Sequence, residues 1–205
     1  MRCLLKYHGG KSRIKSFLLD NFPANYESLN YFELMVGGGG LFYGKKQSIQ
    51  ETISDIDFDV FNSHAFMKLG KFHDIRQISY TEGNFKLALQ GLFGPAISPI
   101  VKFRFSRGGI GKDFAWSERL RNNQPGDQNA WETFLNSLEQ YQERLKNVTI
   151  LNLGYKQLLN NYVNSFYYFD PPYDPDTRVA KKVYKFDWVK QDHIEFLDLE
   201  KNMTS

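Results

Sequence analysis

The alternation of apolar and polar positions predicts a helix followed by a strand at the start of the chain. In residues 12–22 the apolar positions fall on one helical face, and Pro23 ends the pattern. Residues 31–36 form a short apolar run that leads into four consecutive glycines at 37–40. This order is typical of a buried strand that enters a tight turn, and we expect a helix to begin near Leu41.

The following segment extends this pattern into a recognisable unit. Residues 52–56 predict a second strand that ends in acidic side chains, and residues 57–69 predict a helix. A strand, a glycine turn, a helix, a strand and an acid occur in this order in nucleotide-binding βαβ units. The pattern therefore predicts an α/β fold.

Between residues 70 and 130 the sustained periodicity is lost. The segment is rich in glycine, proline, basic and aromatic residues, which predicts a loop-rich insertion or a small domain. Regular patterns then return until the end of the chain. They predict a helix over 130–145, a strand over 148–153, a helix over 155–162, a buried strand and turn over 165–173, and a helix over 190–203.

Composition excludes several classes of protein. With 41% apolar and 24% charged residues among 205, the chain is not largely disordered, and its length suits roughly one domain. The single cysteine, Cys3, excludes an internal disulfide framework, and the four histidines lack metal-ligand spacing. Apolar runs are too short for a membrane span or a signal peptide, so we expect a soluble, cytoplasmic protein without a bound metal. The net charge of +3 only mildly favours an anionic partner.

The most specific motif is the sequence YYFDPPY at residues 167–173. An apolar strand delivers Asp170 onto two prolines, which fix φ and donate no backbone N–H, and Tyr173 follows. The resulting rigid turn directs a carboxylate and carbonyl groups outward. Such a turn can accept hydrogen bonds from an exocyclic amine while the tyrosine ring stacks on the attached base. Alternatively, Asp170 simply caps a loop that the prolines punctuate.

Four motifs occur together in one order. They are KYHGGK at 6–11, ELMVGGGGLF at 33–42, SDID at 54–57 and DPPY at 170–173. In this order and approximate spacing, the chain resembles the Dam-like (D12 class) site-specific DNA adenine-N6 methyltransferases. The resemblance covers nearly the whole chain.

The resemblance implies a Rossmann-like, S-adenosylmethionine-dependent methyltransferase core with an inserted target-recognition region. Residues 1–70 would form the cofactor-binding part of the core. Residues 71–130 would form the target-recognition insertion, and residues 131–205 the catalytic part.

The same resemblance implies a set of residues that bind S-adenosylmethionine. They are Tyr7, Lys11, Glu33, Gly37, Gly39, Asp55 and Asp170. Glycines let the backbone approach a ligand where a Cβ would clash, and a carboxylate after the second strand can accept both ribose hydroxyls. Tyr7 would form an aromatic wall, and Lys11 would place a cation near the carboxylate of the cofactor. In isolation these residues would be read as an ordinary turn, a helix cap, a core tyrosine and a solvated lysine.

By the resemblance, the catalytic residues are Asp170, Pro171, Pro172 and Tyr173. The target adenine would be flipped out of the duplex, because its amine cannot be reached within the stack. Asp170 and the carbonyl of Pro171 would accept hydrogen bonds from the N6 amine, and Tyr173 would stack on the base. Alignment of the amine with the methyl group would supply much of the rate.

Basic and aromatic side chains interleave in the segment 101–128, which is the candidate DNA reader. Its cations are Lys102, Arg104, Arg107, Lys112, Arg119 and Arg121. Cations on a glycine-containing segment suit phosphate contacts, and arginines can also read guanine edges. The bare charge pattern would also fit a solvated face.

The chain departs from the family pattern at two places. Gly154 occupies the position of an acid that usually hydrogen-bonds the adenine amine of the cofactor, and losing this bond costs about 1–3 kcal/mol. Family members also continue past the helix that follows DPPY with further strands. We therefore expect a core that is incomplete at the C-terminus and has an open sheet edge.

The sequence thus predicts methyl transfer from S-adenosylmethionine to adenine N6 in double-stranded DNA. Two alternatives stay open: a catalytically impaired remnant that only binds DNA, and a methyltransferase acting on an amine in RNA or protein. The resemblance leaves room for a cognate restriction endonuclease acting on the same site. The open sheet edge leaves room for self-association.

Overall fold

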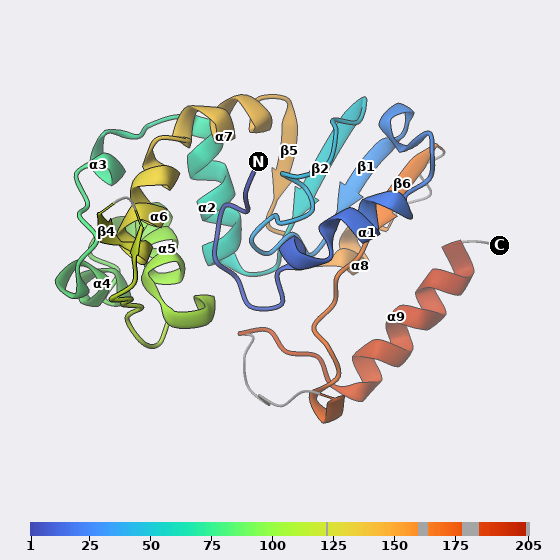
Figure 1. Cartoon of the computed structure of the whole chain (residues 1–205). Helices are drawn as coiled ribbons and strands as arrows, with labels where there is room; N and C mark the ends of the chain where they lie inside the picture. The colour runs from blue at the N-terminus through green and yellow to red at the C-terminus, as the bar shows by residue number, and fades with distance from the viewer. Residues whose placement is uncertain (122, 160–163, 178–184, 204–205) are drawn as a thin grey trace.

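A four-stranded, all-parallel sheet forms the centre of the computed structural model, which describes residues 1–121, 123–159, 164–177 and 185–203 (Figure 1). The strand order is β5-β2-β1-β6. The strands are β1 (Asn30–Glu33), β2 (Gln50–Ser54), β5 (Val148–Leu151) and β6 (Ser165–Tyr168). The mixed α/β architecture with a parallel sheet confirms the predicted α/β class and is consistent with a Rossmann-like core.

The strand order contains a reversal that creates a crevice. The chain passes outward from β1 to β2 and β5, and then returns to place β6 on the other side of β1. Open parallel sheets bind ligands outside the carboxyl ends of their strands at such a reversal. The register places Glu33, the last residue of β1, between Ile53 and Tyr168. The segments that follow β1, β2 and β6 therefore emerge at one edge.

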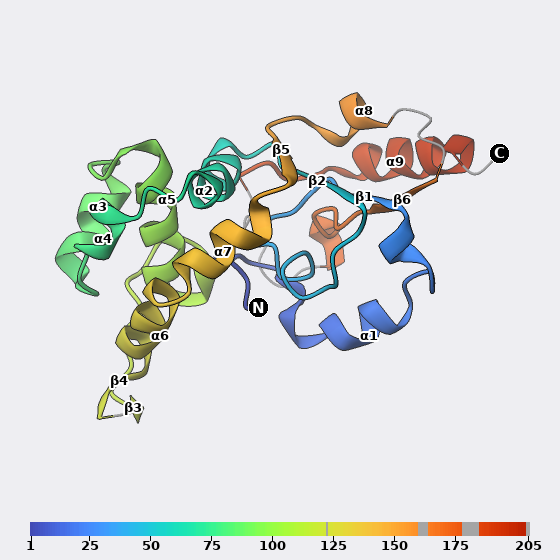
Figure 2. The same cartoon turned by 90° about the horizontal axis from the view of Figure 1, so that it is seen from above.

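Helices cover both sides of the sheet and form a separate group beside it. Figure 2 shows α1 (Lys15–Asp20) on one face of the sheet, with α8 (Tyr155–Leu158) and α9 (Lys190–Met203) on the other. The group beside the sheet centres on α2 (Phe58–Leu69), which packs against α5 (Gly94–Phe105) and α7 (Leu138–Leu145). Its other elements are α3 (His73–Arg76), α4 (Glu82–Leu89), α6 (Gly126–Leu135), and the antiparallel pair β3 (Leu120–Arg121) and β4 (Gln124–Pro125).

Of the two alternatives predicted between residues 70 and 130, the loop-rich insertion is wrong for much of its length, and the small domain stays a prediction. Helices α3, α4 and α5 occupy this segment, and α5 is buried over most of its surface, including the interior Pro99. A helix that is buried nearly all round has no amphipathic period, so its pattern resembles that of an irregular apolar segment. The expected helix over 130–145 is also divided, since α6 ends before α7 begins.

The helix expected from about Leu41 does not form. Residues 40–44 make turns in which the N–H of Tyr43 donates to the carbonyl of Gly39. Leu41, Phe42 and Tyr43 are all buried, which a surface helix with a single apolar face does not allow for three consecutive residues.

Other predicted elements differ at their ends. The helix predicted over 12–22 is reduced to a short 3₁₀ turn at Lys11–Arg13 followed by α1. Helix α8 ends at Leu158, and residues 160–162 of the predicted 155–162 helix lie outside the described residues. The helix predicted over 190–203 is confirmed as α9.

A buried ionic network fixes the segment that follows the glycines. The carboxylate of Glu51 on β2 accepts hydrogen bonds from the ammonium of Lys45 and the guanidinium of Arg144. Arg144 also donates to the carbonyl of Phe42 at 3.2 Å, and its guanidinium lies 4.0 Å from the centre of the Phe42 ring. Because both cations share one buried carboxylate, the chain after the glycine turn is held against the sheet and α7.

Candidate active site

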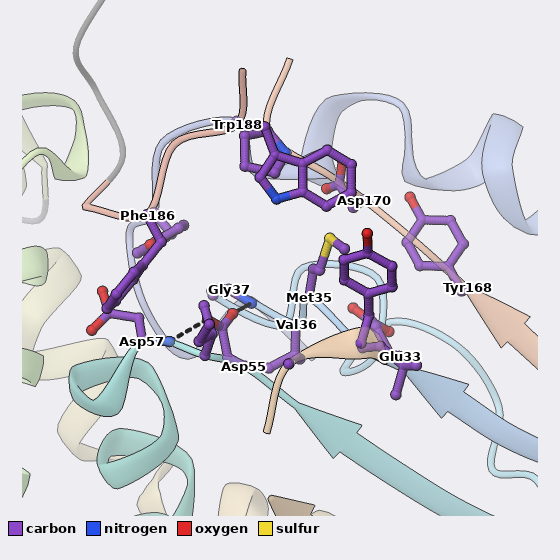
Figure 3. Close-up of a pocket in the computed structure, with 18 of the residues that line it drawn as sticks. Glu33, Met35, Val36, Gly37, Asp55, Asp57, Tyr168, Asp170, Phe186 and Trp188 are labelled. Atoms are coloured by element: carbon purple, nitrogen blue, oxygen red, sulfur yellow. Dashed lines mark hydrogen bonds between the residues drawn. The ribbon is translucent and has the colours of Figure 1, made fainter. Parts of the chain in front are cut away.

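A cavity of about 510 Å³ opens at the carboxyl edge of the sheet (Figure 3). Segments that follow all four strands contribute to its wall: Val36 after β1, Asp55 after β2, Gly154 after β5 and Asp170 after β6. The N-terminal residues 7–11 also line the cavity. This volume is in the range of small-molecule and cofactor sites, and its position is that of the crevice expected from the strand order.

The glycine turn forms the part of the wall that follows β1. Gly37 has φ +49°, which favours a residue without a Cβ. A Cβ on Gly38 would lie 2.5 Å from the carbonyl oxygen of Leu5. Gly37, Gly38 and Gly40 line the cavity, so the backbone is open to a ligand here.

Gly39 differs from the prediction that it binds the cofactor. It does not line the cavity, and a Cβ at this position would lie 2.6 Å from the ring of Tyr43. The glycine is required here by its φ of +70° and by the packing of this aromatic ring beneath the turn.

Asp55 is held in place by two backbone donors. The N–H of Gly37 donates to one of its carboxylate oxygens and the N–H of Asp57 to the other, both at 2.9 Å. Burial raises the pKa of Asp55 to about 6, although these hydrogen bonds oppose the shift. Each carboxylate oxygen has a second lone pair, so this fixed group can still accept hydrogen bonds from two hydroxyls.

His64 supports the same turn from below, a role that the sequence did not reveal. Its Nε2 lies 2.9 Å from the carbonyl oxygen of Gly37, and its Nδ1 lies 2.8 Å from the hydroxyl of Tyr43. Burial lowers the pKa of His64 to about 4, so the ring is neutral near pH 7. The neutral tautomer protonated at Nε2 satisfies both contacts, since it donates to the carbonyl and accepts from Tyr43.

Glu33 is a second carboxyl group in the wall of the cavity. It is almost completely buried at the end of β1 and accepts a hydrogen bond from the hydroxyl of Tyr31 at 2.5 Å. Burial raises the pKa of Glu33 to about 8, although the hydrogen bond from Tyr31 opposes this shift. Glu33 is therefore mainly protonated near pH 7 and can donate as well as accept a hydrogen bond.

The DPPY turn lies across the cavity from Asp55. Asp170 and Pro172 are part of the lining, whereas Tyr173 is 48% exposed beside it. Asp170 forms an ion pair with Lys11, whose ammonium also lies 4.8 Å from the centre of the Tyr173 ring. The sequence placed Lys11 near a cofactor carboxylate, whereas the structure pairs it with the aspartate of the turn.

Apolar and aromatic side chains form the remaining wall. Met35 comes from the motif at 33–42, whereas Tyr155, Phe186 and Trp188 lie outside the four motifs (Figure 3). The rings of Tyr155 and Trp188 lie 5.4 Å apart. These residues supply apolar surface for a ligand, and the high aromatic content of the sequence is the only signal that it gives for Tyr155, Phe186 and Trp188.

Gly154 lies in the lining where the family pattern usually has an acid. Its backbone N–H donates to Oε1 of Gln157 at 3.0 Å, and it precedes the first residue of α8. The residue therefore caps a helix at the cavity wall and contributes no side-chain acceptor.

Five of the six candidate DNA-contacting cations fall into three groups. Arg107, Lys112 and Arg119 are exposed. Lys102 is paired with Asp59, with Nζ and Oδ2 2.5 Å apart. The side chain of Arg121 lies outside the described residues.

The prediction that Arg104 contacts DNA is wrong. Its guanidinium is buried, donates to the carbonyls of Leu4 at 2.8 Å and Cys3 at 3.0 Å, and lies 3.6 Å from the centre of the Phe134 ring. The charge therefore serves to attach the N-terminal segment to the helical group. The sequence shows no helical pattern over α5, and without one it does not distinguish the buried Arg104 from the exposed cations.

Within the described parts of the chain, no helix is long and apolar enough to cross a membrane. The same residues contain no group of three or more histidine, cysteine, aspartate or glutamate side chains that could hold a metal ion.

A parallel α/β sheet whose carboxyl edge carries a glycine turn, a fixed acid and a DPPY turn defines a Rossmann-like methyltransferase core. Residues 114–205 match the family model of the D12 class N6 adenine-specific DNA methyltransferases. This match covers somewhat less than half of the chain, and it supports the family expected from the motifs. A comparison with curated proteins found no match. The matched region contains the DPPY turn, whereas the glycine turn and Asp55 precede it.

Replacement of Glu33 by glutamine should change how stability depends on pH. A carboxyl group with a raised pKa stabilises the folded state below its unfolded value of 4.5, and this contribution is lost as the pH rises toward about 8. Glutamine keeps the shape but does not ionise. We expect the melting temperature of Glu33→Gln, relative to the parent protein, to be higher at pH 9 than at pH 5.

Scanning calorimetry at the two pH values provides the measurement. Glu139→Gln is the matched control, because the Glu139 side chain is 65% exposed and its pKa is lowered. If the difference in melting temperature between Glu33→Gln and the parent protein is equal at both pH values, this would contradict a raised pKa for Glu33.

Proposed function

We propose that the protein transfers a methyl group from S-adenosylmethionine to adenine N6 in double-stranded DNA. The observation that carries this proposal is the cavity at the strand reversal, which has Asp55 and the glycine turn on one side and the DPPY turn on the other. The family match supports adenine in DNA as the target.

The wall of the cavity fits an adenosyl cofactor. Asp55 is fixed with free lone pairs for the ribose hydroxyls, and the backbone at Gly37 and Gly38 is open to close approach. Trp188 and Met35 provide apolar surface for the adenine and the methionine chain. When bound, S-adenosylmethionine supplies an electrophilic methyl group on a sulfonium.

The DPPY turn supplies the acceptors for the target amine. In the proposed reaction, the carboxylate of Asp170 and the carbonyl of Pro171 accept hydrogen bonds from N6, which withdraws the nitrogen lone pair from conjugation with the ring. Pro172 keeps the turn rigid, and the exposed ring of Tyr173 stacks on a base that has been flipped out of the duplex. The methylated amine is acidic and loses its proton without a strong base.

Two of the exposed cations, Arg107 and Lys112, flank a turn that lines a second cavity. Residues 109–111, between Arg107 and Lys112, line a smaller cavity of about 160 Å³. Tyr7, His8 and Asp57 line both cavities. We propose that Arg107, Lys112 and Arg119 contact the phosphates of the duplex and bring the flipped base toward Tyr173.

Methyl transfer can be tested with S-adenosylmethionine carrying a labelled methyl group and unmethylated duplex DNA. We expect N6-methyladenine in the digested product, and a loss of at least about 100-fold in kcat for Asp170→Asn. Cofactor binding by calorimetry should persist in Asp170→Asn and weaken in Asp55→Asn. Label in RNA or protein instead of DNA would contradict the substrate, and cofactor binding unaffected by Asp55→Asn would contradict the cofactor site.

DNA binding should depend on the exposed cations through their charge. For the double variant Arg107→Gln/Lys112→Gln, we expect weaker binding to duplex DNA. The slope of log K against log salt concentration should be less steep by about 2, since each phosphate contact contributes about 0.9. Fluorescence anisotropy at several salt concentrations measures this slope.

The matched control for this measurement is Lys46→Gln/Lys146→Gln, which removes two other exposed charges. An equal change in slope for both double variants would show that only net charge matters, and would contradict the proposed DNA face. Two further partners remain predictions: a cognate restriction endonuclease, suggested by the resemblance, and a second copy of the chain, suggested by the open sheet edge.

A further inference from the structure

Lys11 contacts both of the side chains that the proposed reaction assigns to the target adenine. Its ammonium forms an ion pair with the carboxylate of Asp170 and lies 4.8 Å from the centre of the Tyr173 ring. It also donates to the carbonyl of Gly9 at 3.0 Å, within its own segment. One cation therefore lies at the acceptor for the N6 amine and at the ring that would stack on the base.

We propose that Lys11 is a positioning residue that orients Asp170 and keeps it ionised before DNA binds. When the target adenine enters, Lys11 releases its ion pair with Asp170. The inference rests on the proposed function. It reassigns Lys11 from the cofactor carboxylate to the target side of the cavity.

Burial makes this contact important for Asp170. The side chains of Lys11 and Asp170 are 12% and 24% exposed, so water provides limited solvation for either charge. Burial raises the pKa of Asp170, and the charge and hydrogen bond of Lys11 oppose this shift. Burial also lowers the pKa of Lys11, but its interactions with Asp170 and Tyr173 outweigh this and leave the pKa raised. Each of the two groups therefore favours the charged form of the other.

Other ionisable groups also face this turn, and any test must distinguish their effects on Asp170 from the effect of Lys11. Glu33 on β1 interacts with Asp170, and its main cationic neighbours are Lys45 and Arg144. Tyr168 on β6 interacts with Asp170 and Tyr173, and its pKa is raised by burial. Removal of Lys11 should therefore act chiefly on Asp170.

The test compares Lys11→Met, Lys11→Arg and the parent protein. Methionine fills similar space without a charge, and arginine restores the charge. We expect Lys11→Met to lower kcat/KM for DNA at pH 7 by about tenfold or more, and to move the acidic limb of its pH profile upward by about one pH unit. The parameter kcat/KM is chosen because it reports groups of the enzyme before substrate binds.

Three comparisons make the outcome specific. Lys11→Arg should restore most of the activity and the position of the limb. The dissociation constant for S-adenosylmethionine should change less than about threefold in Lys11→Met, because the residue faces Asp170. Lys46→Met, which removes an exposed ion pair with Glu27, should leave both parameters unchanged. The same comparison in Glu33→Gln protein removes the titration of Glu33 from the profile.

An unchanged acidic limb together with a large loss of cofactor affinity would overturn the inference and favour a contact between Lys11 and the cofactor carboxylate. A carbon-detected NMR titration of Asp170 gives a readout that does not need turnover. Its pKa should be higher in Lys11→Met than in the parent protein, and equal values would overturn the inference even for an inactive enzyme. Absence of methyl transfer by the parent protein, with the NMR difference present, would instead contradict the proposed function.

Discussion

The backbone of Gly37 is held through both its N–H and its carbonyl group, and the arrangement of the cavity depends on this constraint. Its N–H donates to Asp55 after β2, and its carbonyl oxygen contacts Nε2 of His64 on α2. The turn after β1 is thereby tied to the next strand and to the helix that follows it. Because Gly37 lies at φ +49°, a side chain here would strain the turn that presents the open backbone.

The N-terminal segment transmits this geometry to the helical group. The N–H of Leu4 donates to the carbonyl of Gly38 at 2.8 Å, while the carbonyl of Leu4 accepts from Arg104. A Cβ on Gly109 would collide with the carbonyl oxygen of Lys6, so the turn carrying the exposed cations packs directly on this segment. The segment continues to Lys11, whose side chain forms an ion pair with Asp170 of the DPPY turn. One short stretch of chain thus connects the proposed DNA face with both sides of the cavity.

The sequence predicted those parts of the molecule whose chemistry requires unusual residues. Consecutive glycines and an acid that ends a strand located the side of the cavity that we propose binds the cofactor, and the prolines after Asp170 located the turn opposite. The sequence did not separate Arg104 from the exposed cations, because α5 is buried on nearly all sides and has no helical period. It also missed His64, Phe186 and Trp188, whose places depend on long-range packing and not on local spacing. Lys11 was identified, but its partner was not, because an ion pair across the cavity leaves no pattern along the chain.

The central claim is that one cavity holds the methyl donor beside the turn that receives the target amine. A crystal structure of the protein with S-adenosylhomocysteine, the demethylated product of the donor, tests this claim most directly. The account predicts that the ribose hydroxyls lie within hydrogen-bond distance of Asp55 and that the sulfur faces Asp170. A product molecule bound outside this cavity, or one whose ribose lies at Asp170 and whose sulfur points away from the DPPY turn, would contradict the account.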